Sequence, residues 1–438
     1  MSYSTQIFLQ IKDPNVTLYD ELTEEVVVKG KKSIVAHGKV TYKPKACEHC
    51  GCKNEHFSIV KHGTRSSTIT LLPCSGMNTY LKLIKQRFQC KHCKKFFTAE
   101  TDIVDKNCFI AKSVKLHVAD QLFDEFTETI IAKQHNISVH TVRRITRGLG
   151  KKLVTKPGNS LPTHLCFDEF KSVKSSHAAM SFIYCDAKTH QLIDIIEDRR
   201  CHNLIDYFMR FSLKTRQAVE TVTIDMYKPY ITLINTVFPN AKIIVDPFHI
   251  VLAINRELNK TRVKVMNSFK SKNHRLYNKY KRYWKLLLAK TETLDSYTYS
   301  RYPLFDWMTN TCGIVDYLLE QSEELKATYR IAHQLRDALA DKDFEQFKAA
   351  LIEAKHSPIS KGLRRLIRTF TKLLPYIENT FNYPYTNGPI EGLNNKIKVL
   401  KRNAYGYRNF DHFKARIFLM MKLYAPDSKK QTLQHKAA

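Results

Sequence analysis

Three acidic residues stand in settings that suit chemistry on a phosphodiester. Asp168 and Asp225 each end a short apolar run, and Glu391 falls in the first turn of a helix expected to begin at Pro389. Breaking or joining a phosphodiester needs an activated oxygen nucleophile and a stabilised leaving oxygen, and two divalent ions about 4 Å apart can supply both. Because hard ions prefer carboxylate ligands, the acids predict a site for two Mg²⁺ ions, or Mn²⁺.

Each acid taken alone is better explained as a helix cap or a solvated side chain, so the prediction depends on the three occurring together. Asp246 and His249 follow the next expected strand, 241–245. They are candidates for second-shell support of the metals, for DNA contacts or for control of the proton balance. A strand end and a helix cap explain them as well.

The elements that must hold these acids change in character along the chain. From 163 to about 250, short β-rich runs alternate with helical ones, which predicts a mixed α/β region. It includes an expected hairpin of 179–184 and 191–196. From 252 to 381 the long amphipathic stretches predict an all-α region. Residues 386–424 again have a helical pattern.

Six of the eleven cysteines lie between Cys47 and Cys93, which marks a small separate module. Two C-x-x-C pairs provide four thiolates, the usual ligand set of one structural Zn²⁺ ion. These four are Cys47, Cys50, Cys90 and Cys93. The long gap between the pairs can hold a β-hairpin of 68–72 and 81–88. The competing ligands are Cys52, Cys74, His49 and His92.

The segment 126–145 has the pattern of a helix-turn-helix. A short helix is followed by a turn at 135–137, and Ser138 is expected to cap a second helix. In the usual docking the second helix enters the major groove of DNA. An ordinary helical hairpin is the alternative. The side chains expected to project outward and contact DNA are those of Ser138, His140, Thr141, Arg143 and Arg144.

The charge of the chain favours a nucleic-acid partner. Seventy-one Lys and Arg face 41 Asp and Glu, giving a formal net charge of +30. Such an excess repels itself unless an acidic partner neutralises it, and nucleic acid is the usual one. An anionic membrane or acidic proteins are the alternatives. No apolar run reaches the ~18 residues of a membrane-spanning helix, and no signal peptide is recognisable, so we expect a cytoplasmic protein without a membrane partner.

The stretch 256–290 is the most basic part of the expected all-α region. It holds a single acid, Glu257, and the aromatic residues Tyr277, Tyr280, Tyr283 and Trp284 are interleaved with its cations. We expect its cations to contact phosphates, while stacking of DNA bases on the rings is the less favoured reading. A solvated basic helix with aromatics in its core is the alternative. Trp307 is expected in the core.

Several motifs together resemble bacterial insertion-sequence transposases of the ISL-three type. They are Phe167–Phe170, Asp225–Tyr230, Asp246–His249, Asn387–Lys398 and Arg402–Asn409, together with the cysteine pairs and the helix-turn-helix. The resemblance covers roughly residues 43–424. It implies a DDE transposase with Asp168, Asp225 and Glu391 as the catalytic triad. It also implies an RNase H-like fold with an all-α insertion between the second and third acids.

The resulting expectation is a multidomain α+β protein whose RNase H-like α/β core is interrupted by an all-α insertion. Its expected parts are an N-terminal segment (1–42), a zinc-binding module (43–105), a helix-turn-helix domain (106–155), the first part of the core (160–252), the insertion (253–382), the last part of the core (383–425) and a flexible tail (426–438). A linker is expected at 156–162. Further DNA contacts are expected on the helix that carries Glu391, at Asn395, Lys398, Lys401 and Arg402.

The expected function is cleavage of DNA at the ends of an insertion sequence, followed by strand transfer into target DNA. The zinc module and the helix-turn-helix would bind the terminal inverted repeats. Because two ends must be joined together, a homodimer or larger assembly on double-stranded DNA is expected, associated with the bacterial nucleoid. The alternatives are a non-catalytic DNA-binding regulator and an RNase H-like nuclease without strand transfer.

Overall fold

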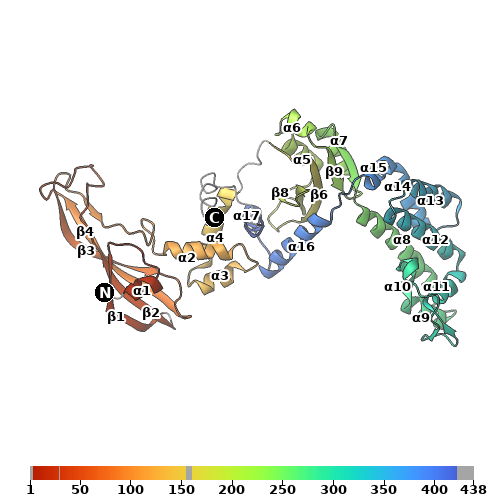
Figure 1. Ribbon diagram of the computed structural model, residues 1–438, viewed down its shortest axis with the longest axis horizontal. Coiled ribbons are helices and arrows are strands. Elements are labelled where there is room, and N and C mark those ends of the chain that lie inside the picture. The colour runs from red at the N-terminus through yellow and green to blue at the C-terminus, as the bar shows by residue number, and fades with distance from the viewer. Residues whose placement is uncertain (1–2, 29, 154–159, 422–438) are drawn as a thin grey trace, which may run out of the picture. The chain divides into compact units, whose positions relative to one another are not determined.

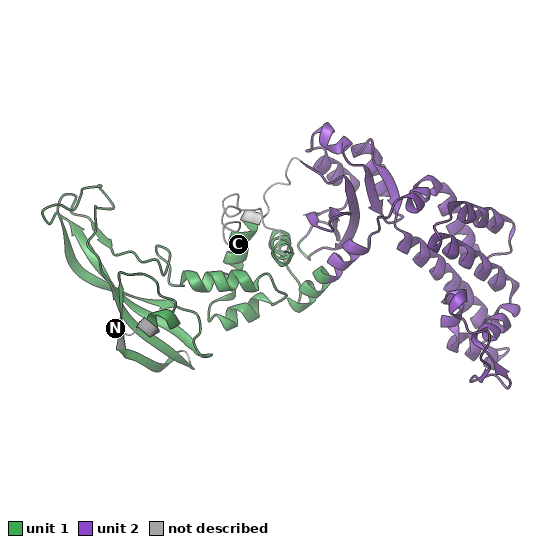
Figure 2. Cartoon of the chain, viewed as in Figure 1, with its two compact units in different colours: residues 1–156, 173–175, 396–438 green, residues 157–172, 176–395 purple. Residues whose placement is uncertain are grey.

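The computed structural model describes residues 3–28, 30–153 and 160–421 (Figure 1). The chain divides into two compact units (Figure 2). The first contains 1–156, 173–175 and 396–438, and the second contains 157–172 and 176–395. Most of the expected linker and all of the expected tail lie outside the described residues. The multidomain α+β class is confirmed, since each unit combines a five-stranded sheet with helices.

The sheet of the first unit begins before the cysteine pairs. After helix α1 (Tyr3–Phe8), its strands are β1 (Val16–Val28), β2 (Lys31–Val40), β3 (Ile59–Thr70), β4 (Asn78–Cys90) and β5 (Phe96–Thr98). Their order is β1-β2-β4-β3, with β5 also on β4. The antiparallel β3–β4 pair confirms the expected hairpin. The expected boundary at residue 42 differs from the structure, because β2 pairs with β4 and joins both parts in one sheet.

Four helices share a hydrophobic core with this sheet: α2 (Lys112–Gln121), α3 (Glu128–Gln134), α4 (Val139–Leu153) and α17 (Phe410–Met420). Helix α17 packs against α4 although more than half of the chain separates them. The sequence assigned 383–425 to the end of the catalytic core. In the structure, residues from Lys396 onward group with the first unit instead.

Arg416 on α17 provides a polar link within the first unit. Its side chain is fully buried, and its guanidinium donates hydrogen bonds to the backbone carbonyls of Leu122, Asp124 and Phe126. Burial lowers the pKa of this guanidinium from its usual range. Because the three carbonyls directly follow α2, these charge-assisted bonds hold the C-terminal helix against the helical region.

The close approach of α4 and α17 depends on Gly150. A Cβ atom built at Gly150 would lie 2.5 Å from Cβ of Ala415, whereas one built at Gly148 meets nothing within 4 Å. We therefore expect Gly150→Ala to lower the free energy of unfolding of the first unit, because overpacking of about 1–3 kcal/mol outweighs the gain of about 1 kcal/mol in helix propensity. Urea denaturation followed by circular dichroism measures the change. Gly148→Ala is the matched control and should be neutral or stabilising; equal effects of the two substitutions would contradict the packing argument.

The second unit is built on a mixed sheet with the order β10-β9-β6-β7-β8. The strands are β6 (His164–Lys171), β7 (Met180–Asp186), β8 (Leu192–Ile196), β9 (Thr221–Ile224) and β10 (Lys242–Val245). The antiparallel β7–β8 pair confirms the second expected hairpin. Strands β6, β9 and β10 run parallel. Their carboxyl ends therefore meet at one edge of the sheet.

Helices make up most of the rest of this unit. They are α5 (Cys201–Phe208), α6 (Leu213–Gln217), α7 (Lys228–Val237), α8 (Pro247–Ser268), α9 (His274–Arg282), α10 (Trp284–Leu288), a 3-10 turn (Thr291–Thr293), α11 (Thr311–Glu320), α12 (Glu323–Ala340), α13 (Phe344–His356), α14 (Lys361–Lys372) and α15 (Leu374–Asn382). The region expected to be all-α also contains a two-residue ladder of β11 (Ser300–Arg301) and β12 (Met308–Thr309). Helix α16 (Gly388–Asn403) follows, and the division between the units falls within it.

The aromatic residues of the basic stretch differ in exposure. Tyr280 and Tyr283 are buried and pack in the core of the helical region, so they cannot stack on a base, whereas Trp284 is 37% exposed. The expectation that Trp307 is a core residue is wrong, since its side chain is 49% exposed. Its ring centre lies 5.1 Å from Nζ of Lys279, with which it forms a cation–π contact.

None of the helices in the described part of the chain is long and apolar enough to span a membrane.

Candidate active site

Strand register lines up three acids at the carboxyl edge of the second sheet. Cys166 on β6 pairs with Thr223 on β9, so Asp168 and Asp225 each lie two residues beyond that pair. Ile224 pairs in turn with Val245, so Asp246 lies beside Asp225. From the sequence we expected the first of these strands to end at Asp168. In the structure β6 continues to Lys171, because residues beyond Asp168 still pair with the antiparallel strand β7. Asp168 therefore lies where the pairing of β6 with β9 has ended.

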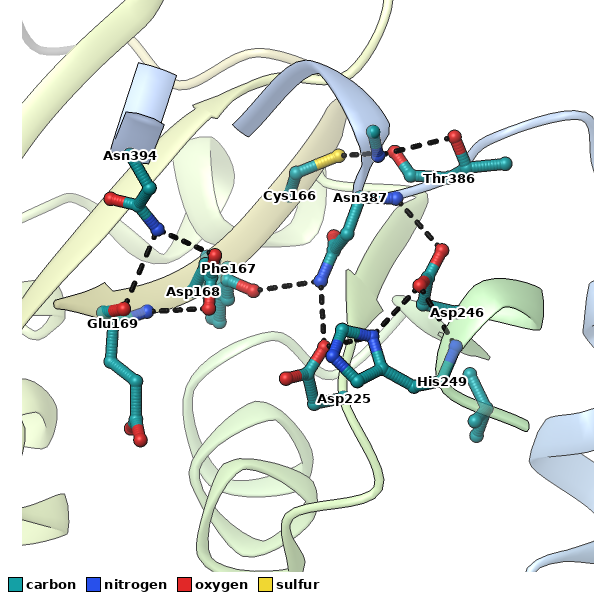
Figure 3. Close-up of polar contacts among 12 residues, drawn as sticks. Cys166, Phe167, Asp168, Glu169, Asp225, Asp246, His249, Thr386, Asn387 and Asn394 are labelled. Atoms are coloured by element: carbon teal, nitrogen blue, oxygen red, sulfur yellow. Dashed lines mark hydrogen bonds and ion pairs between the residues drawn. The ribbon is translucent and has the colours of Figure 1, made fainter. Parts of the chain in front are cut away.

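Two amides from the start of α16 bridge this row (Figure 3). Nδ2 of Asn387 donates to Oδ1 of Asp225 at 3.1 Å and to the carbonyl of Phe167 at 3.2 Å. Nδ2 of Asn394 donates to Oδ2 of Asp168 at 2.6 Å. Both asparagines are buried. The two strand acids are therefore held by one helix whose residues lie more than 150 positions further along the chain.

Asp246 and His249 hold Asp225 from the other side. Nδ1 of His249 lies 2.9 Å from Oδ1 of Asp225 and 2.9 Å from Oδ2 of Asp246. Asp246 is almost fully buried, caps α8 through the backbone N–H of His249, and accepts the backbone N–H of Asn387. The helix-cap interpretation of Asp246 is thus confirmed. The same side chain also links Asp225, His249 and the start of α16.

The charges of the site are strongly coupled. Burial raises the pKa of Asp168 to about 6, and the nearby negative charge of Asp225 adds to this effect. Hydrogen bonds to Asp225 and Asp246 raise the pKa of His249 to about 10, so its imidazolium neutralises part of the acidic charge. A raised carboxyl pKa beside a second carboxylate is typical of sites that concentrate negative charge.

Glu391 lies between the two bridging asparagines along α16. It is half-buried and follows Asn387 by four residues and precedes Asn394 by three, so all three share one face of the helix. Asp225, Asp246 and His249 form a group whose potential ligand atoms lie within 4.8 Å of one another, and Asp168 and Glu391 are outside that group. The structure thus brings Asp168 and Asp225 to one edge and the Glu391 helix against them.

The donor set at this edge suits a hard divalent ion. Carboxylates are the ligands that Mg²⁺ and Mn²⁺ prefer, and the edge presents those of Asp168 and Asp225, with Glu391 on the helix that adjoins them. Oδ1 of Asn387 and Oδ1 of Asn394 are buried, and within the described chain neither accepts a hydrogen bond. A buried amide oxygen without a donor costs free energy, whereas the Nδ2 groups of the same two side chains face the acids and are satisfied by them.

The sequence missed Asn387 and Asn394 as functional residues. It placed Asn395 and Lys398 on the face of Glu391, but both side chains are exposed, and Asn394 makes the contact to Asp168. Asn394 and Asn395 lie three and four residues after Glu391, and both spacings place a side chain on the same face of a helix. Spacing alone therefore could not show which of the two contacts Asp168. The sequence feature that could have identified them is an asparagine within about one helical turn of Glu391 on each side, Asn387 before it and Asn394 after it.

The first unit contains a separate metal-binding arrangement. The sulfurs of Cys47, Cys50, Cys90 and Cys93 lie within 4.8 Å of one another. Cys47 Sγ is 3.7 Å from Cys93 Sγ, and Cys50 Sγ is 3.8 Å from Cys90 Sγ. Four sulfurs about 2.3 Å from a tetrahedral Zn²⁺ ion would be about 3.8 Å apart. The four-cysteine cluster therefore supports one structural Zn²⁺.

Backbone geometry shapes the two cysteine pairs alike. The N–H of Gly51 donates to the carbonyl of Cys47, and the N–H of Lys94 donates to the carbonyl of Cys90. Gly51 and Lys94 both have positive φ angles, 69° and 59°. Burial opposes ionisation of the Cys47 thiol, but backbone N–H groups outweigh it and lower its pKa to about 6. The competing ligands Cys52, Cys74, His49 and His92 are not part of the cluster.

Helices α3 and α4 carry the residues expected to contact DNA. Ser138 caps α4 by accepting the N–H of Thr141, as expected. Four of the five candidate side chains are exposed: those of Ser138, His140, Arg143 and Arg144. The expectation that Thr141 projects outward is wrong, because it is buried and its hydroxyl lies 3.0 Å from that of Ser138. On α16, Arg402 is exposed and Lys401 is half-buried.

Comparison with known protein families adds an independent line of observation. Residues 165–417 match a family model of the ISL3 type described as transposase. Residues 43–93 match a model described as the zinc-finger of transposase IS204/IS1001/IS1096/IS1165. The first match covers more than half of the chain and includes all the acids of the candidate site.

Two curated proteins are similar over different lengths. The transposase for insertion sequence element IS1001 from Bordetella parapertussis is 25% identical over 391 residues, which are 86% of this chain and 88% of that protein. A protein of Lactococcus lactis subsp. lactis named ATP-dependent protease is 42% identical over 106 residues. That match covers 24% of this chain and only 34% of the length of that relative.

Proposed function

The chain belongs to the ISL3-type family of insertion-sequence transposases, and from this premise we propose that it cuts DNA at the ends of its element and joins them to target DNA. The row of Asp168 and Asp225, bridged by two amides of the Glu391 helix, carries this proposal. Carboxylates that lie close together repel one another unless a cation neutralises them, and two-metal phosphoryl transfer uses such a group of acids.

We assign the catalytic triad to Asp168, Asp225 and Glu391. Mg²⁺ or Mn²⁺ bound by these acids would supply an activated oxygen nucleophile and stabilise the leaving oxygen. Asn394 holds the Asp168 carboxylate and Asn387 holds that of Asp225, so both acids are oriented before DNA arrives. Asp246 and His249 position Asp225 from behind, in the manner of groups that orient metal ligands.

The fold of the second unit supports an RNase H-like core. Its mixed sheet has three parallel strands, and the acids lie at their carboxyl ends. The helical region α8–α15 follows β10 and precedes α16, in agreement with an insertion between the second and third acids. The proposed end-binding surface lies on the first unit, through the zinc module and the exposed residues of α4. We propose further DNA contacts in the first unit at Lys398, Lys401 and Arg402. A further contact is proposed at Asn395, which belongs to the second unit.

The test is a strand-transfer assay with duplex DNA of the terminal inverted repeats, a target plasmid and Mg²⁺. Joined products at cut ends are expected, and a two-ended product would require the proposed homodimer or larger assembly. Cut ends that are never joined would indicate an RNase H-like nuclease instead. Specific binding without cutting would indicate a non-catalytic regulator.

The two bridging asparagines give a further prediction. We expect Asn387→Ala and Asn394→Ala each to lower the cleavage rate about 10–100-fold and to raise the Mg²⁺ concentration needed for half-maximal rate, as is usual when groups behind metal ligands are removed. Cleavage rates measured across a Mg²⁺ titration separate this role from a purely structural one. Asn382→Ala, at an exposed position, is the control. An unchanged Mg²⁺ requirement in both variants would refute the positioning role.

A further inference from the structure

A cleft in the first unit has no role in the proposed catalysis. Its volume is about 390 Å³, and it lies between the start of α3, the exposed face of α4 and the turn that precedes α17. The residues that line it include Glu128, Arg143, Arg147, Tyr407, Arg408 and His412. The cleft therefore lies between α4, the second helix of the expected helix-turn-helix, and the Arg402–Asn409 segment, one of the motifs that carry the family resemblance.

The cleft is positively charged. Three arginines line it, and Arg147 and Arg408 are exposed and form no ion pair with a described residue. Its acid, Glu128, is buried and already accepts a hydrogen bond from Thr146. The same carboxylate lies 2.7 Å from Nε2 of His412 and 3.4 Å from Nε of Arg143. Two arginine charges thus remain without an ion-pair partner among the residues of this unit that the structure describes.

The turn that carries Arg408 is fixed by backbone geometry. Just after the end of helix α16 come two residues with positive φ, Tyr405 at 53° and Gly406 at 97°. The N–H of Gly406 closes the helix by donating to the carbonyl of Lys401 at 2.9 Å. Tyr407 is then buried, with its ring 4.7 Å from that of Phe413. Arg408 is consequently held at the surface beside α4 rather than carried on a free loop.

The surrounding backbone also favours an anion. Helix α17 begins at the cleft, where Asn409 accepts the N–H of His412 at 2.8 Å. The first turn of this 11-residue helix contributes partial positive charge. The acid in that turn, Asp411, does not line the cleft. Arg147 lies one turn beyond Arg143 on α4, so the cleft continues the exposed basic face expected to meet DNA.

From these observations we propose that the cleft binds a phosphate of the DNA backbone beside the groove that receives α4. The phosphate is held by Arg147 and Arg408, with Arg143 at the edge of the cleft. This inference rests on the proposed function, since it requires that the first unit binds the ends of the element. It assigns to residues 404–409, which follow the Glu391 helix, a direct part in end binding.

The test uses the full chain and fluorescently labelled duplex DNA of the element's terminus, with binding followed by anisotropy over a range of KCl concentrations. The variants are Arg147→Gln, Arg408→Gln, their combination, Arg408→Lys, and Arg301→Gln as an exposed control of equal charge change. We expect the double variant to bind at least about tenfold more weakly at physiological salt. The magnitude of the slope of log K against log salt should fall by about one, because the phosphate that both arginines hold is no longer neutralised.

Arg408→Lys should restore most of the slope, since it keeps the charge, and Arg301→Gln should leave affinity near that of the wild type. If the wild-type chain binds the terminus and the double variant binds it with the same affinity and the same salt slope, the cleft assignment is wrong while the proposed function stands. Failure of the wild-type chain to bind its terminus would instead overturn the proposed function, and the cleft with it. Far-ultraviolet circular dichroism and melting of each variant show that the change is not one of folding.

Discussion

Replacing Glu391 with glutamine is expected to lower the rates of DNA cleavage and strand transfer by on the order of 10³-fold or more. Glutamine keeps the shape of the side chain but removes the negative charge. Losing one carboxylate ligand of a metal pair removes several kcal/mol of transition-state stabilisation. The half-buried position of Glu391, between the two asparagines that bind Asp168 and Asp225, is the structural reason for choosing it.

End binding should survive this substitution. The proposed DNA-binding surface belongs mainly to the first unit, whereas Glu391 belongs to the second. Asp225→Ala tests the same site less cleanly, because it also removes one of the two partners of His249 Nδ1 and of Asn387 Nδ2. Gel-shift binding and a time course of cleavage on the same terminal duplex separate the two steps. Glu378→Gln, at an exposed position on α15, is the matched control. If Glu391→Gln cut DNA at the normal rate, the glutamate assignment would be wrong.

The sequence predicted the strands and their acids because the signal is local. Apolar runs ending near Asp168 and Asp225 identify β6 and β9 without knowledge of their neighbours. The pairing that sets β6 beside β9, and β9 beside β10, depends on contacts between distant segments. The sequence could therefore name the acids without placing them in one row.

The parts that sequence reasoning missed involve long-range contacts. Strand β1 is interrupted by acids, so its alternation is obscured, and only its pairing with β2 identifies it. Arg416 resembles any surface arginine in the sequence, yet it is buried by packing of α17 on the region after α2. Thr141 lies within the predicted outward set, but the capping turn buries it. Each case was decided by a partner that local patterns do not reveal.

The second large effect is expected from loss of the zinc ligands. We expect the double variant Cys47→Ser, Cys90→Ser to lose its bound Zn²⁺, to lose the folded sheet of the first unit and to stop binding the terminal duplex. Structural zinc contributes about 10–16 kcal/mol of apparent free energy in small zinc-binding domains. That is comparable with the whole stability of a typical domain, about 5–15 kcal/mol.

The loss should spread beyond the cysteine pairs because the ligands are part of the core. Cys47 and Cys90 belong to the same hydrophobic cluster as Phe88 and Val118, which extends from the sheet to α2. Zinc content per chain, the melting curve and anisotropy with the terminal duplex measure the three effects. Cys52→Ser and Cys74→Ser, outside the cluster, should keep one Zn²⁺ per chain and normal binding. A full zinc content in the double variant would show that other residues hold the ion, and unchanged melting after its removal would show that the sheet folds without it.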